Sequence, residues 1–308
     1  MHPMTVRPRV AIALVAVLFA SGCSIRKMAV KTMADALSEG SSGYSTDNDP
    51  ELVKEALPFG LKTLEGLLVE LPTHRPLLRT LASGFTSYAV AFIAPEIRAL
   101  EEVDLERSRE QRVRARLMLI RARDYALRSL EAGYPGFRKA LQEDPVKAAA
   151  RVKIDDIEDL YWAAASWGSA ISLGKDQMGL VVEVPMVEAL IRRAYTLNDA
   201  WDNGSIHEFL IVFESRGEAS GGSYKRAREH FEKAMTISKG RKVGPLVALA
   251  ENVSLQLQDR KEFEELLDRA LAFDPETAPE LRLVNLIGQR RAKQLKAIAD
   301  QLFLEDEK

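Results

Sequence analysis

Cysteine is almost absent from this sequence, since Cys23 is the only one among 308 residues. A single cysteine excludes an internal disulfide. An excess of charge of one sign is also lacking, because 43 lysines and arginines stand against 45 aspartates and glutamates. A chain with neither a basic excess nor a basic stripe is not expected to bind nucleic acid.

The motifs of common enzyme classes are missing as well. The sequence holds no P-loop, no dinucleotide fingerprint, no G-x-S-x-G nucleophile and no H-E-x-x-H zinc motif. His74, His207 and His230 have no second histidine or cysteine at zinc-ligand spacing. Glu208 follows His207 on a predicted helix, where adjacent side chains diverge by about 100° and do not converge on one atom. We therefore predict no catalytic residue, metal site or cofactor, and the protein is not expected to be an enzyme. An all-helical cell-wall enzyme that uses one glutamate remains an alternative.

The first 22 residues have the order of a secretory signal peptide. Arg7 and Arg9 supply positive charge, residues 10–20 form an apolar run, and Ala-Ser-Gly precedes Cys23. The stretch FASGC resembles the lipobox of bacterial lipoproteins, in which the cysteine is acylated and becomes the new N-terminus. We predict a signal peptide at 1–22 and lipidation of Cys23. The alternative is an ordinary secreted protein with a buried Cys23.

Acylated Cys23 is expected to hold the protein on a lipid membrane of the bacterial cell envelope, facing the periplasm. Ser24 stands where many lipoproteins retained at the inner membrane carry aspartate, which favours the outer membrane. No later stretch is predicted to be long and apolar enough to span a bilayer.

Beyond Cys23 the sequence predicts only helices. It is rich in Ala, Leu, Glu, Arg and Lys, which favour helices, and it lacks alternating strand patterns between turns. Residues 23–50 are predicted to form a lipid-anchored helix and a linker, and residues 51–308 one helical domain. Pro95 is expected to end a helix, and residues 180–184 are expected to form a loop. The predicted helices are 51–71, 77–93, 111–131, 157–173, 186–198, 204–215, 224–239, 244–258, 260–272 and 277–304.

Triplets of apolar and small residues recur in the C-terminal half. Successive triplets begin 40 and 36 positions apart. This period and the small residues predict an all-α array of antiparallel helix pairs, built as degenerate tetratricopeptide-like repeats. The alternative is a helical bundle with small residues at its contacts. The triplets are Val187-Ile191-Ala194, Ala227-Phe231-Ala234 and Phe263-Leu267-Ala270.

Large aromatic residues crowd one predicted helix in a chain that is 7% aromatic. Tyr161, Trp162 and Trp167 lie there beside Ala and Gly positions. Such rings can wall a ligand cavity or fill the core, and both interpretations stay open. Four acidic residues lie at the start of this helix: Asp155, Asp156, Glu158 and Asp159. Acidic residues are common in the solvated first turn of a helix, so we favour this interpretation over a cation site.

The stretch DLYWAAASWGSAISLG at 159–174 resembles the hallmark of the TatT family, the tetratricopeptide-like lipoprotein component of TRAP transporters. Further stretches are similar in the same order at 59–78, 207–216, 221–235, 258–271 and 285–303. The resemblance therefore covers nearly the whole mature chain. The sequence departs from the family pattern after His207. Other residues stand there at three positions, Ile211, Phe213 and Glu218, and no proline follows Arg216.

The resemblance implies a periplasm-facing lipoprotein that forms a homotrimer with a pore in each protomer. The implied partner is a TRAP-type extracytoplasmic solute-binding protein, and the implied task is to hold, pass on or shield a small apolar ligand. Tyr161, Trp162, Trp167 and His207 are the residues expected at this cavity or pore. The alternative is a helical-repeat scaffold lipoprotein for envelope protein assembly, which would bind proteins on a concave surface.

Overall fold

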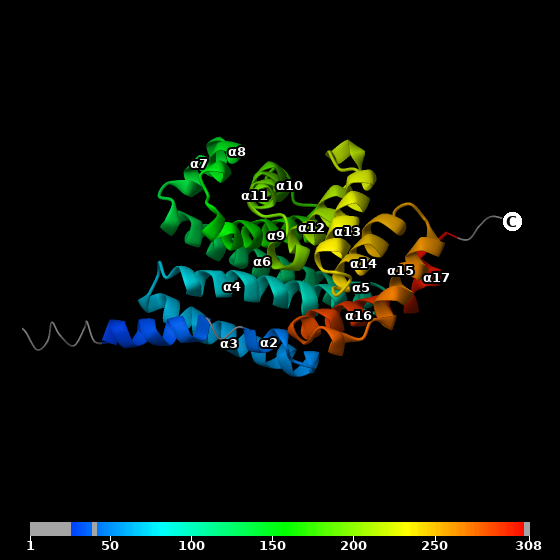
Figure 1. Cartoon of the computed structure of the whole chain (residues 1–308), viewed down its shortest axis with the longest axis horizontal. Helices are drawn as coiled ribbons and strands as arrows, with labels where there is room; N and C mark the ends of the chain where they lie inside the picture. Colours follow the sequence, from blue (N-terminus) through cyan, green and yellow to red (C-terminus); the bar gives the residue numbers. More distant parts are fainter. Residues whose placement is uncertain (1–25, 39–41, 305–308) are drawn as a thin grey trace, which may run out of the picture.

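The computed structural model describes residues 26–38 and 42–304, and this part of the chain contains helices and no strand (Figure 1). The predicted all-α class is therefore confirmed. The predicted signal peptide and Cys23 lie outside the described residues. Residues 26–38 form a helix that precedes α2.

The N-terminal half is built from long helices. The bounds are Ser42–Ser45 for α2, Pro50–Glu70 for α3, Arg75–Tyr88 for α4, Ala94–Glu101 for α5, Leu105–Gly133 for α6, Phe137–Glu143 for α7 and Pro145–Ala150 for α8. In the C-terminal half they are Ile157–Leu173 for α9, Met178–Val181 for α10, Val184–Leu197 for α11, Trp201–Glu214 for α12, Tyr224–Ile237 for α13, Gly244–Leu249 for α14, Arg260–Ala272 for α15, Arg282–Ala297 for α16 and Ala299–Leu302 for α17. Between these lie the π turns Ala89–Ile93 and Ala250–Ser254 and the 3₁₀ turns Ile154–Asp156, Glu218–Ser220, Pro275–Thr277 and Pro279–Leu281.

Short polar side chains fix where several helices begin. The Asp49 carboxylate accepts hydrogen bonds from the backbone N–H groups of Glu51 and Leu52, and Pro50 occupies the first turn of α3. Asp104 caps α6 by accepting from the N–H of Arg107, and Asp259 caps α15 in the same way. Each cap satisfies a backbone donor that the first helical turn leaves unpaired.

Pro95 does not end a helix, so that prediction is wrong. Helix α4 runs through the π turn Ala89–Ile93 directly into α5, and Pro95 lies in the first turn of α5. The π turn changes the hydrogen-bond pattern just before a residue that has no N–H to donate, so the helix continues. The sequence also missed α7 and α8 and placed the start of α6 six residues late, and the expected loop at 180–184 overlaps α10.

The continuous helix Arg75–Glu101 is long and apolar enough to cross a membrane by length and composition, contrary to the sequence expectation. Its most apolar window is 56% buried inside the protein. It packs against α3, α6 and α9, and buried leucines of α4 belong to the core. These contacts identify it as a core helix.

The helix pairs of the C-terminal half follow the triplets. Helix α9 packs on α6 and α11, α12 packs on α13, and α14 packs on α15 (Figure 1). All nine triplet residues are buried, and the alanines Ala194, Ala234 and Ala270 have no exposed surface. The predicted array of helix pairs is therefore confirmed. Helix α16 then returns to α2 and α3, where the Arg282 guanidinium donates to the carbonyl oxygen of Thr46 at 2.8 Å.

Replacing Ala270 with leucine should destabilise this array by about 1–3 kcal/mol, because the added methyl groups have no space between α15 and its neighbours. Urea unfolding of the variant measures the change. Ala272→Leu is the matched control, since Ala272 is exposed on the same helix. Equal stability of the two variants would contradict the proposed role of the small residue.

Candidate functional site

Three aromatic rings meet where α9 passes the start of α12. The Tyr161 ring lies 5.0 Å from the Trp162 ring and 4.7 Å from the Trp201 ring, measured between centroids. All three residues are partly exposed. We call Tyr161, Trp162 and Trp201 the aromatic cluster.

Small residues allow the helices to come this close. A Cβ atom at Gly168 of α9 would lie 3.1 Å from the ring of Phe209 on α12, tighter than ordinary packing. A Cβ atom at Gly244 would overlap the carboxylate of Glu208. Glycine at both positions therefore lets α9, α12 and α14 approach around the aromatic cluster.

A chain of polar side chains runs beside the aromatic cluster. The Lys242 ammonium donates to the Ser205 hydroxyl at 2.7 Å and lies 3.0 Å from the Glu208 carboxylate. The Ser205 hydroxyl donates to the Asp202 carboxylate at 2.6 Å. Lys242 and Ser205 are buried, and Asp202 is exposed. Two groups of the same chain, Ser205 and Glu208, therefore hold the buried ammonium.

The backbone at the start of α12 is unusual. Asp202, Asn203 and Gly204 all adopt left-handed conformations, with φ angles of 47°, 54° and 86°. Single Asn, Asp or Gly residues adopt this conformation readily, but successive residues do so at a cost of about 1–2 kcal/mol each for non-glycine residues. The turn directs the chain from Trp201 into the helix that carries Ser205 and Glu208.

Burial shifts the pKa values of two side chains in the first turns of α9. Burial, together with the neighbouring Asp159 and Asp202, raises the pKa of the Glu158 carboxyl. Burial is also the largest cause of the raised pKa of the Tyr161 hydroxyl, followed by the charges of Glu208 and Asp202. Added negative charge is therefore disfavoured at this place.

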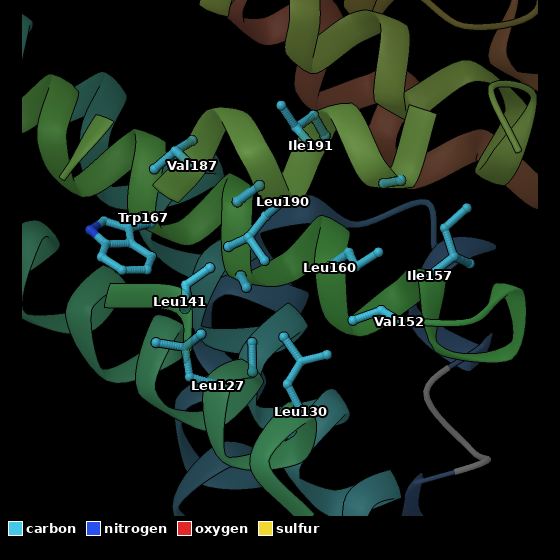
Figure 2. Packing of buried hydrophobic residues seen from close by; sticks show 14 of the residues in the cluster. Leu127, Leu130, Leu141, Val152, Ile157, Leu160, Trp167, Val187, Leu190 and Ile191 are labelled. Carbon is cyan, nitrogen blue, oxygen red and sulfur yellow. The ribbon is translucent and has the colours of Figure 1, made fainter. Parts of the chain in front are cut away.

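The structure separates Trp167 from the other predicted aromatic residues. Trp167 is only 4% exposed and belongs to the core cluster that includes Val187 and Leu141 (Figure 2). Its indole N–H donates to the Glu183 carboxylate at 2.7 Å, and the Arg123 guanidinium covers its ring. Trp167 is a core residue with a satisfied polar atom, whereas Tyr161 and Trp162 remain accessible.

His207 lies in a different cluster, across the interface of α12 and α13. It is fully buried, and its Nδ1 atom lies 2.8 Å from Nδ1 of His230. Its Nε2 atom has no hydrogen-bond partner and lies 3.6 Å from the Asp199 carboxylate. Because the two ring nitrogens face opposite partners, His230 and Asp199 cannot share one ion with His207. No group of three metal-binding side chains occurs within the described ranges.

Acidification should destabilise the fold through this histidine pair. Burial, followed by the nearby His207, lowers the pKa of His230 from 6.5 to about 4, and burial lowers the pKa of His207. Between about pH 6.5 and pH 4 the unfolded chain binds more protons than the folded chain. The free energy of unfolding therefore falls as the pH falls below about 6.5. For His230 the loss reaches about 3 kcal/mol near pH 4.

Urea unfolding of the wild type and His230→Gln at about pH 7.5 and about pH 5 measures this contribution. Carboxylates titrate in both proteins, so the difference between the two pH dependences isolates the histidine. The variant should lose less stability on acidification than the wild type. Parallel losses would contradict the assignment.

The acidic group at the start of α9 is not simply a solvated face. Asp159 is 1% exposed, and its carboxylate accepts from the Arg75 guanidinium at 2.6 Å and from Arg79 at 2.8 and 2.9 Å. Asp156 accepts from the same two arginines. The hydrogen bond with Asp159 is the largest influence that raises the pKa of Arg79. These ion pairs fasten α9 to α4.

Sequence reasoning missed most of the residues around the aromatic cluster. Trp201 lies 39 positions from Trp162, and Lys242 lies 37 positions from Ser205, so no local spacing joins them. The one available signal was the Asp-Asn-Gly sequence at 202–204, which is typical of a turn with positive φ angles. The histidine pair joins residues 23 positions apart on different helices and has no sequence signature.

The chain is similar to a known protein family over most of its length. A family model described as "TRAP transporter T-component" matches residues 46–303, which is most of the chain. A protein of Treponema pallidum (strain Nichols), described as an uncharacterized protein, is 29% identical over 307 residues. That alignment covers 94% of this chain and 95% of the relative.

Proposed function

The chain belongs to the TRAP transporter T-component family, and on this premise we propose that it is a periplasm-facing lipoprotein accessory of a TRAP-type transport system. In this role it binds the extracytoplasmic solute-binding subunit and handles a small ligand. The family match over residues 46–303 carries the proposal. The partly exposed aromatic cluster supports the ligand part, because aromatic surface beside placed polar groups is typical of small-molecule sites.

Direct binding to the solute-binding subunit tests the proposal. The mature protein, without residues 1–22, is immobilised, and purified solute-binding proteins from the same genome are passed over it. We expect the TRAP-type protein to bind and a solute-binding protein of an ATP-driven importer to pass without binding. Capture of neither, or of both equally, would contradict a specific TRAP partner.

We extend the proposal to the anchor at Cys23, with the outer membrane as the favoured location. Cys23→Ser should prevent acylation and release the protein from the membrane fraction, because the acyl chains supply the firm anchoring. Fractionation and metabolic labelling with a fatty acid measure the two effects. A variant that stays in the membrane fraction and keeps its label would disprove the lipidation.

The proposal also includes a homotrimer, as the family resemblance implies. Light scattering of the mature, non-acylated protein gives the mass of the assembly directly. A mass that stays at one chain over a wide concentration range would contradict the trimer without affecting the partner assignment.

A further inference from the structure

Within the described ranges, no arginine or lysine lies over a ring of the aromatic cluster, whose three residues are partly exposed. Elsewhere in the described ranges, arginine or lysine groups lie over Phe85, Tyr125, Trp167, Tyr195 and Phe213. None lies over Tyr161, Trp162 or Trp201 in the same part of the chain, although each keeps exposed surface. Ring faces carry negative electrostatic potential and attract cations.

The charged groups around these rings are mainly negative. Glu158 lies in the first turn of α9, three residues before Tyr161, and the charges of Glu208 and Asp202 contribute, after burial, to the raised pKa of the Tyr161 hydroxyl. Lys242 is the cation tied directly into this group, and it is held by Ser205 and Glu208. The neighbouring Arg75 and Arg79 are engaged by Asp156 and Asp159. Glu158 and Asp202 are thus left without a fully formed ion pair in the described structure.

We propose that the aromatic cluster, with Glu158 and Asp202, binds an organic cation such as a quaternary ammonium group. This inference rests on the proposed function, because it names the class of the small ligand that the protein handles. Methyl groups on the cation pack on Tyr161, Trp162 and Trp201, while the two carboxylates balance its charge. The left-handed turn at Asp202–Gly204 holds Asp202 beside Trp201.

The alternative ligand classes fit less well. A carboxylate or phosphate ligand would meet Glu158 and Asp202 at short range, and the buried Lys242 is already engaged by Glu208. Like charges in a partly buried site repel, so an anion is disfavoured relative to a cation. A purely apolar ligand could contact the rings but would bury the carboxylates without compensation.

Titration with choline and with 3,3-dimethyl-1-butanol tests the charge of the ligand. The second compound has the same shape as choline, with a carbon atom in place of the charged nitrogen. Calorimetry gives the affinities, and quenching of tryptophan fluorescence reports contact with Trp162 and Trp201. We expect choline to bind on the order of tenfold more tightly than its neutral analogue.

Two charge-removing variants locate the site. Asp202→Asn keeps a residue that tolerates the left-handed conformation, and Glu158→Gln keeps the side-chain shape. Each should weaken choline binding by about fivefold and leave the weak binding of the neutral analogue unchanged. Glu229→Gln is the matched control, because Glu229 is exposed on α13 and pairs only loosely with Lys225 at 4.0 Å. Circular dichroism checks that each variant is folded.

The outcomes separate this inference from the proposed function. Equal binding of choline and its neutral analogue, no binding of choline, or no effect of both charge-removing variants would overturn the cation site. Binding of the TRAP-type solute-binding protein would stand in each case, since that interaction is measured without choline. Loss of partner binding together with intact choline binding would instead overturn the proposed function and keep the site.

Discussion

Replacing Trp167 with alanine should lower the free energy of unfolding by about 3–5 kcal/mol. The Trp167 side chain fills space between α9 and its neighbours and is only 4% exposed. The variant also leaves the Glu183 carboxylate without the indole N–H, which donates to it at 2.7 Å, and removes the ring covered by Arg123. Urea unfolding and the melting temperature measure the loss.

Trp162→Ala is the matched comparison on the same helix. Trp162 is partly exposed, so its removal should cost about 1 kcal/mol and should weaken binding of the small ligand while the protein stays folded. Comparable destabilisation by both substitutions, with ligand binding retained in the folded fraction, would show that both tryptophans only fill the core.

Replacing Asp159 with asparagine should cost about 3 kcal/mol, which is the lower end of the range for breaking a buried ion pair. The Asp159 side chain has no exposed surface, and both of its arginine partners lie within 3 Å of it. Asparagine keeps the volume but removes the negative charge, which leaves Asp156 as the carboxylate that pairs with Arg75 and Arg79. The loss stays at the lower end because the two arginine side chains are 28% and 21% exposed, so water still reaches them.

Asp155→Asn is the control for this prediction. Asp155 belongs to the same acidic run and is exposed, so its replacement should change stability by less than about 0.5 kcal/mol. Thermal and urea unfolding of both variants provide the comparison. If Asp159→Asn were no more harmful than its control, the ion pairs would not be what fastens α9 to α4.

The same ion pairs connect stability with the candidate site. Asp159 is separated by one residue from Tyr161, and Glu158 precedes it, so the ion pairs of Asp159 fix the first turn of α9, which leads directly into Tyr161 and Trp162. We therefore expect Asp159→Asn to weaken the proposed choline binding indirectly, through the position of α9.

Much of the helical pattern could be predicted because helices form from local signals. The predicted bounds 157–173 and 260–272 agree with α9 and α15, where acidic residues open each helix and small or apolar residues recur at helical spacing. The triplets correctly placed nine residues in the core, because a repeating pattern of small and large side chains reflects repeated helix contacts.

Local signals were insufficient where helices contact one another. Pro95 indicates a helix end in isolation, but the preceding π turn and the packing against α6 carry the helix past it. The sequence predicts a solvated position for Asp159 at the helix start. In the structure, two arginines of α4 donate hydrogen bonds to its carboxylate. The packing of α12 against α13 determines that His207 meets His230.

The sequence by itself determined the helical class, the repeat of helix pairs and the resemblance to the T-component family, and it predicts acylation at Cys23. Each of these depends on residues close together in the chain or on a recurring pattern. Only the tertiary structure decided that Trp167 is core, that Trp201 joins Tyr161 and Trp162, and that Lys242 is held by Ser205 and Glu208. These contacts form because folding brings together helices that are distant in sequence, and their geometry depends on how those helices dock.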